Sequence, residues 1–186
     1  METITLKGRE IPLLYTVYEM KEIQEEIASL GDFQYVILGR NKDDEEDASR
    51  YGSPDHLNAI AKLIRILGNA GLEEAGEAPD LTDKKILRSM RPADLVDAIN
   101  ACMQAMSAGM ASEIPENKSE GPVDVTLEAI NKKKSEGKLT YLLVVSWGLI
   151  AGLSLSEIHR MRPGAVMDLY LYRRQYDDVL HWITRG

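Results

Sequence analysis

Few residues of this 186-residue chain have the types and the spacing that catalysis or metal binding requires. The three histidines, His56, His159 and His181, are scattered and form neither an HxxxH nor an HExxH motif, the spacings that place zinc ligands on one helical face. Cys102 is the single cysteine, and its apolar neighbours predict a buried thiol rather than a nucleophile in a polar cleft. No serine lies in a GxSxG motif. The sequence therefore predicts no catalytic, cofactor-binding or metal-binding residues, and a protein that is not an enzyme.

One acidic run and one pair of glycines superficially resemble ligand sites. Residues 43 to 47 are all Asp or Glu, but they lack the glycine and the terminal glutamate spacing of a calcium loop. Like-charge runs of this kind usually form solvated loops, and we expect one here. Gly68 and Gly71 have neither the GxGxxG nor the GK[ST] context of a phosphate loop.

Methionine, tyrosine and arginine are the residue types whose spacing could support binding to another protein. Three methionines recur at helical spacing, and flexible thioether chains can line adaptable grooves. Methionines so spaced more often fill a core, which we favour, with a partner groove as the alternative. Further along the chain, tyrosines alternate with arginines, and both types commonly anchor protein interfaces. The candidate partner-binding residues are Met103, Met106, Met110, Tyr170, Tyr172, Arg173, Arg174 and Tyr176.

The longest uncharged run of the chain, Leu139 to Leu155, precedes the tyrosine-rich segment. Three interpretations stay open: a buried core helix, a helix that also meets a partner, and a membrane span. Gly152 is typical of a helix stop, and Ser154 with Glu157 predicts a capping box that starts a new helix. That leaves a helix of about 20 Å at 1.5 Å per residue, which is short against a hydrocarbon core of roughly 30 Å. A core helix is therefore favoured.

The first part of the chain predicts a hairpin followed by helices. Thr3 to Leu6 and Arg9 to Leu14 alternate as strands around a two-residue turn that contains Gly8, and Pro12 predicts an edge position. Thr16 begins a capping box and a helix that should end at Gly31. For residues 32 to 38 we favour a helix over a strand.

Later helices of the first part are predicted from their starts. Ser53 and Pro54 open one that should end near Gly68 and Gly71, and Thr82 caps a short one to about Ser89. Pro92 should open the longest helix of this part. Its apolar face would consist of Leu95, Ile99, Cys102, Met106 and Met110.

Composition divides the chain into two helical parts joined by a polar segment. Residues 112 to 123 contain two prolines and little apolar content, which predicts a linker. We expect a mostly α (α+β) fold: an N-terminal β-hairpin and helical bundle over 1–111, and a C-terminal helical segment over 124–186 that can pack on the first part. Within it, Val125 to Glu136 predicts a short helix, and Pro163 starts the last one. Without a signal-peptide pattern, the cytoplasm is the expected location.

A short internal similarity links the two parts. Met90 to Asp97 aligns with Met161 to Asp168, and each follows a short capped helix. This helix–turn–helix pattern leaves a small DNA-binding regulator as an alternative, with phosphate contacts from His159, Arg160, Arg162, Arg173 and Arg174. The net charge of −8 argues against nucleic acid as a partner.

The complete layout resembles the tail assembly chaperones of long-tailed phages and prophages of Gram-positive bacteria. The segment from Thr3 to Thr16, with the helix that contains Met20 and Ile23, looks like the start of these proteins. The segment from Leu139 to Asp178 looks like the second part that their extended form acquires. The resemblance covers most of the chain outside the linker.

This resemblance implies a non-catalytic role in tail morphogenesis. The first part would coat the tape-measure protein, and the extension would recruit tail-tube subunits, with self-association as a further contact and no nucleic acid, membrane or cofactor. Such proteins are not retained in the finished tail. In the family, programmed frameshifting makes a short and an extended form, so Lys132 to Lys134 could mark an adenine-rich slippery run in the messenger. A natural fusion in one frame stays open, as does a membrane-associated phage protein that uses residues 139–155.

Overall fold

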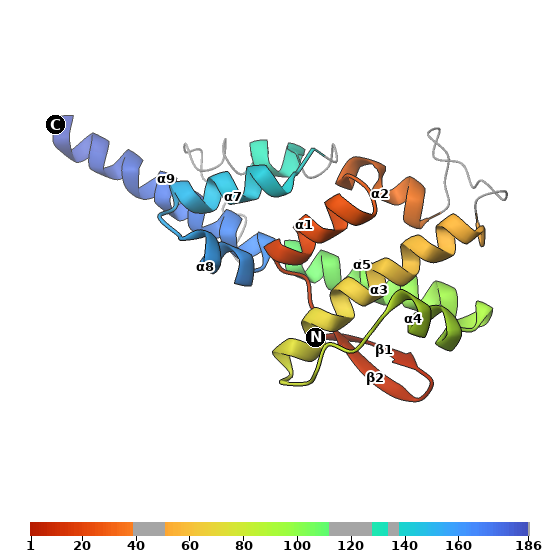
Figure 1. The fold of residues 1–186 in the computed structure, drawn as a ribbon. Coiled ribbons are helices and arrows are strands. Elements are labelled where there is room, and N and C mark those ends of the chain that lie inside the picture. The colour runs from red at the N-terminus through yellow and green to blue at the C-terminus, as the bar shows by residue number, and fades with distance from the viewer. Residues whose placement is uncertain (39–50, 112–127, 134–137, 186) are drawn as a thin grey trace.

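The computed structural model describes residues 1–38, 51–111, 128–133 and 138–185 (Figure 1). The fold is mostly helical with an N-terminal two-stranded antiparallel sheet, which confirms the predicted fold class. The elements are β1 (Glu2–Leu6), β2 (Arg9–Leu13), α1 (Val17–Glu26), α2 (Leu30–Ile37), α3 (Pro54–Glu74), α4 (Asp83–Ser89), the 3₁₀ turn η1 (Pro92–Asp94), α5 (Leu95–Met110), α7 (Tyr141–Ile150), α8 (Leu155–Arg160) and α9 (Pro163–Arg185). Residues 128–133 are also helical.

The hairpin forms as predicted, around a turn of Lys7 and Gly8. Both residues have positive φ, +50° and +83°, which is the type I′ geometry that matches the twist of the flanking strands. Ile4 pairs with Ile11, and both are buried on the same face of the sheet. The hairpin therefore covers the helices α3 and α5 with its apolar face.

Helix α1 begins at the predicted capping box, in which the Glu19 carboxylate accepts hydrogen bonds from the backbone N–H and the hydroxyl of Thr16. The helix ends at Glu26 rather than at Gly31, because a turn separates it from α2. The favoured helix over residues 32–38 is confirmed by α2.

Helix α3 begins at Pro54 as predicted, but the predicted end near Gly68 and Gly71 is wrong. The helix continues through both glycines to Glu74, which makes it the longest helix of the first part. A Cβ atom on Gly71 would lie 2.1 Å from the carbonyl oxygen of Pro12. The glycine allows β2 to approach the helix backbone, and it does not act as a stop.

The segment after α4 also differs from the prediction. Pro92 does not open a long helix: it begins the 3₁₀ turn η1, and α5 follows from Leu95 with 16 residues against the 21 of α3. The predicted apolar face is present, with Cys102 fully buried and Met110 only partly buried.

The C-terminal helices begin and end close to the predicted residues. Gly152 has φ +93° and follows α7, and the Ser154–Glu157 capping box starts α8. Helix α9 begins at Pro163. Helix α7 has 10 residues, and within the described ranges no helix combines the length and apolar character needed to cross a membrane.

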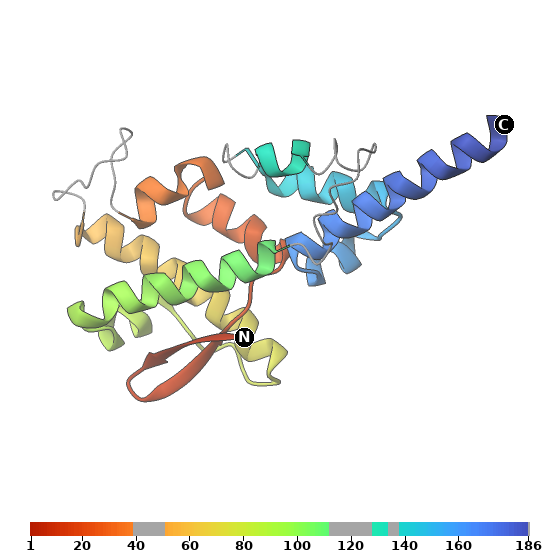
Figure 2. The ribbon, with the colours of Figure 1, turned by 180° about the vertical axis from the view of Figure 1, so that it is seen from behind.

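These helices pack against the first part of the chain (Figures 1 and 2). The Thr16 hydroxyl donates to the carbonyl oxygen of His159 at 2.8 Å. A Cβ atom on Gly164 would lie 1.9 Å from the carbonyl oxygen of Ala111, so the start of α9 lies directly against the end of α5. Helix α9 then packs along α7, and its C-terminal part extends away from the body of the molecule (Figure 2).

The internal similarity corresponds to a shared local structure. Met90 and Met161 each follow a short helix and have an extended backbone conformation. The N–H of Met90 donates to the carbonyl oxygen of Ile86, and that of Met161 donates to the carbonyl oxygen of Ile158. The two copies diverge at the proline, which starts a 3₁₀ turn in one and α9 in the other. The predicted acidic loop at 43–47, the linker at 112–123 and the ends of the helix predicted over 125–136 lie outside the described residues.

Candidate protein-binding surfaces

Helix α7 carries large apolar residues on every side, with the exposed Ser146 among those of its outer side, but it is buried on one side only. Its inner residues Val144 and Trp147 are buried, whereas Leu142, Leu149 and Ile150 are 71%, 54% and 54% exposed. A helix that is apolar all round is normally enclosed by protein. The outer face of α7, defined by Leu142, Leu149 and Ile150, is therefore a candidate binding surface.

The inner side of α7 is fixed by close contacts with α8 and α9. The ring of Trp147 stacks on that of Tyr170, with centroids 5.5 Å apart and planes 16° from parallel. A Cβ atom on Gly148 would lie 2.6 Å from Ile158 side-chain atoms. The absence of a side chain at Gly148 lets α8 and α7 approach, and the outer face of α7 is held in one orientation as a result.

The predicted tyrosine and arginine residues lie on α9. Tyr172 and Tyr176 are each 56% exposed. The Arg173 guanidinium lies 6.0 Å from the Tyr176 ring centroid and 3.3 Å from the Asp177 carboxylate, and Arg174 is exposed. Tyr170 differs from the others because it is half-buried in its stack with Trp147.

The predicted methionine residues lie on α5, separate from the tyrosines. Met106 is buried in the core, whereas Met103 and Met110 are partly buried and pack against it. Most of this face therefore fills the core. The two predicted groups lie on different helices, the methionines on α5 and the tyrosines and arginines on α9.

A polar cluster lies where α1 meets α7 and α8. The Tyr141 hydroxyl and the Nε2 of His159 are 2.8 Å apart, and the His159 ring also lies edge-on to Tyr18. Burial raises the pKa of the Glu19 carboxyl, and hydrogen bonds from Thr16 oppose that rise. Across the described ranges no cation forms an ion pair with Glu19. Thr16 and Glu19 cap the start of α1, and Tyr141 and His159 connect α7 to α8. These polar residues therefore have a structural role.

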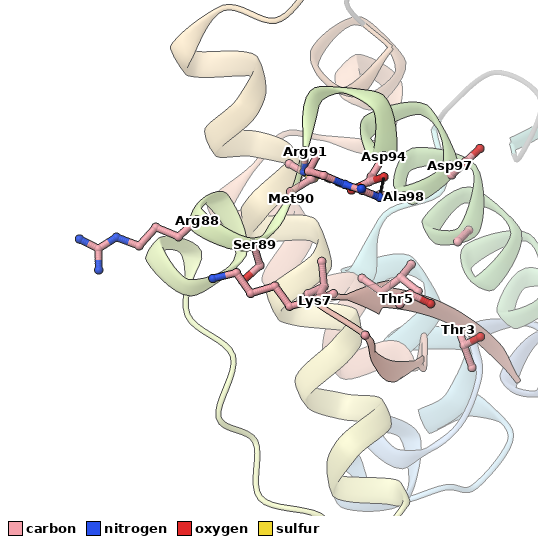
Figure 3. Close-up of a pocket in the computed structure, with 14 residues that line it drawn as sticks. Thr3, Thr5, Lys7, Arg88, Ser89, Met90, Arg91, Asp94, Asp97 and Ala98 are labelled. Atoms are coloured by element: carbon pink, nitrogen blue, oxygen red, sulfur yellow. Dashed lines mark hydrogen bonds and ion pairs between the residues drawn. The ribbon is translucent and has the colours of Figure 1, made fainter.

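A pocket of about 680 Å³ lies between β1 and the α4–α5 turn (Figure 3). Residues Thr3 to Gly8 line one wall consecutively, and residues from Arg88 to Ala101 line the other. Arg91 and Asp94, which both lie on the α4–α5 wall, form two hydrogen bonds of 2.9 Å with each other, and this pairing lowers the pKa of Asp94. The sequence offered no direct signal for this pocket, since its walls come from segments about ninety residues apart that no motif connects.

No group of three or more histidine, cysteine or acidic side chains is placed to hold a metal ion in the part of the chain that the structure describes. Burial raises the pKa of the Cys102 thiol to about 12, so the thiol is protonated and unreactive at neutral pH. No family model, curated protein or solved structure matches the chain.

Proposed function

We propose that this protein is a non-catalytic tail assembly chaperone of a long-tailed phage or prophage. In this proposal it holds the tape-measure protein, recruits tail-tube subunits in the host cytoplasm, and leaves before the tail is complete. The observation that carries the proposal is the outer face of α7, where three large aliphatic side chains are exposed on a rigidly docked helix. Exposed apolar surface of this kind marks a site for another protein.

The binding mode follows from the chemistry of that face. Long apolar helices of a partner would lay side chains against Leu142, Leu149 and Ile150, each contact contributing little by itself. The exposed tyrosines of α9 supply anchors of a different type, with rings that bury area at a low entropic cost. Two surfaces of different chemistry on one chain suit a protein that brings two unlike partners together.

The helix–turn–helix alternative is disfavoured by the packing of α9. A recognition helix contacts base edges with its N-terminal residues. In α9 those positions include Gly164, Val166 and Met167, all of which are buried against the rest of the molecule. Among the first five residues of α9 only Ala165 is partly exposed, so this turn has no free recognition face and the protein-binding proposal has more support.

The experiment is co-expression of the tagged full chain with the tape-measure and tail-tube proteins encoded beside it, followed by affinity capture. The test variant is Leu149→Ser with Ile150→Ser, and the matched control is Val96→Ser, which alters an exposed apolar residue on α5. We expect the wild type and the control to retain a tail protein and the double variant to lose most of it. Capture of neither tail protein by the wild type would refute the proposal.

A further inference from the structure

The two edges of the hairpin differ in whether their backbone groups are used. On the β2 edge, the N–H of Leu14 donates to the carbonyl oxygen of Leu67 at 3.0 Å. Pro12 has no N–H, and its carbonyl oxygen lies against Gly71 of α3. The β2 edge is therefore covered by α3 at its Pro12 end.

The β1 edge is open, and the turn geometry identifies its free groups. In a two-residue hairpin the residues that flank the turn exchange hydrogen bonds, and the pairs then alternate between bonded and non-bonded. Leu6 and Arg9 flank the turn, so Thr3 and Thr5 lie in non-bonded pairs and direct their N–H and C=O groups outward. Among the described residues none bonds to these outward groups.

The free edge forms one wall of the 680 Å³ pocket (Figure 3). Residues Thr3 to Gly8 all contribute, irrespective of which side of the strand their side chains occupy, so the pocket follows the backbone of β1. The opposite wall is the α4–α5 turn and the first turns of α5. A groove between a strand edge and a helix suits an added strand, because the strand supplies backbone partners and the helix supplies side-chain contacts.

The charges along the groove are unequal at its two ends. Lys7 lies at the turn end and forms no ion pair across the described ranges, whereas the Arg88 guanidinium points away from the groove (Figure 3). Arg91 is neutralised by Asp94, and Asp97 lies toward the other end. A chain of net charge −8 thus has a basic end on this groove, which is complementary to an acidic ligand residue.

We propose that the groove along β1 binds an extended peptide segment of another protein, which adds to the hairpin as a third, antiparallel strand. Its acidic N-terminal end lies beside Lys7, and its backbone pairs with Thr3 and Thr5. This contact is separate from the outer face of α7, and it does not depend on the phage assignment.

The test uses the full chain and a capped, fluorescently labelled peptide that begins with two aspartates, continues with alternating threonine and valine, and ends with lysine. We expect saturable binding by fluorescence anisotropy. A control peptide of the same composition, in which the aspartates and the lysine exchange ends, should bind more weakly. Two further versions of the peptide carry methyl groups on alternate backbone nitrogens, one version on the edge that would face β1 and the other on the opposite edge. Only the version methylated on the β1-facing nitrogens should fail to bind.

A protein variant tests the strand edge directly. Thr5→Pro removes one outward N–H without touching a hairpin hydrogen bond, and loss of one backbone bond should weaken binding about tenfold. Glu10→Pro is the matched control, because Glu10 lies opposite Thr5 on the other edge. Equal effects of the two methylated peptides, or no binding of any peptide, would overturn the proposal whether or not the proline variants fold. Concentration-dependent dimerisation that Thr5→Pro abolishes would overturn it in favour of a second copy of this chain.

Discussion

The backbone N–H of Val17, the first residue of α1, donates a 2.9 Å hydrogen bond to the carbonyl oxygen of Met161, in the turn between α8 and α9. The start of a helix in the first part of the chain is thus satisfied by the C-terminal segment. Orphan N–H groups at helix starts need such partners. The C-terminal helices consequently stabilise the first part as well as carrying surfaces of their own.

Trp147→Ala should show how firmly α7 is docked on α9. The indole is 7% exposed and stacks on Tyr170, so its removal leaves a cavity and should lower the free energy of unfolding by about 3–5 kcal/mol. Leu142→Ala on the same helix is the control, because that side chain is 71% exposed and should cost less than about 1 kcal/mol. Urea denaturation followed by circular dichroism measures both. Equal losses would mean that α7 is not docked as described.

Gly71→Ala should destabilise the protein, although alanine is the better helix former by about 1 kcal/mol. The new methyl group would lie 2.1 Å from the Pro12 carbonyl oxygen, and backbone on both sides leaves no easy relaxation. We expect a net loss of about 1–3 kcal/mol. Gly68→Ala is the comparison, since its nearest neighbour at 2.6 Å is the movable Leu81 side chain. A thermal melt should therefore show the larger decrease for Gly71→Ala, and the reverse order would contradict the close approach of β2.

The two capping-box glutamates should have opposite pH dependences. Burial raises the pKa of Glu19, so the folded state holds its proton over a range in which the unfolded chain has lost it. The free energy of unfolding then falls as the pH rises from about 4.5 through the folded pKa. Glu19→Gln keeps a capping-box residue type and removes the titration. The stability of this variant relative to wild type should increase with pH.

Glu157 should change the free energy of unfolding with pH in the opposite direction. Hydrogen bonds from Ser154 lower the pKa of this carboxyl, so its contribution to stability is present above the unfolded pKa and is lost as the pH falls through the folded one. Glu157→Gln should be less stable than wild type at neutral pH and equal to it in acid. Urea titrations between pH 3 and 7 would compare the two variants, and parallel slopes would contradict the difference in burial.

Cys102 should be protected from thiol reagents in the folded protein. Its side chain is fully buried, and burial raises its pKa to about 12. At pH 8 we expect no reaction with a disulfide reagent until denaturant is added, and then one thiol per chain. Ser146→Cys supplies an exposed thiol on α7 as the positive control. Rapid labelling of the wild type would show that α5 opens readily.

Local signals in the sequence were enough to place most helix starts. Thr16, Ser53, Thr82 and Ser154 each accept a hydrogen bond from the first turn of the helix that they were predicted to cap. Capping involves residues only two or three positions apart, so it can be predicted without knowledge of the tertiary structure.

Features that depend on distant segments were not predictable in the same way. Gly71 was wrongly predicted to end its helix. Its actual role is to let the backbone at Pro12 approach, and this contact exists only in the folded chain. The orientation of α7 is a second case, since a helix that is apolar on all sides carries no periodic signal for its exposed face. The open edge of β1 is a third, because the sequence predicts strands but not which one α3 covers.

The uninterrupted length of α9 imposes a geometric condition on any assembly that this chain forms. Its 23 residues span about 34 Å at 1.5 Å per residue, and the helix projects from the body as a straight arm in both views (Figures 1 and 2). Because such an arm sets the distance between its far end and the hairpin, a ligand that engages both regions must be long enough to span that distance. A ligand of matching length gains the most avidity, a longer one gains less, and one that is too short is held at a single point.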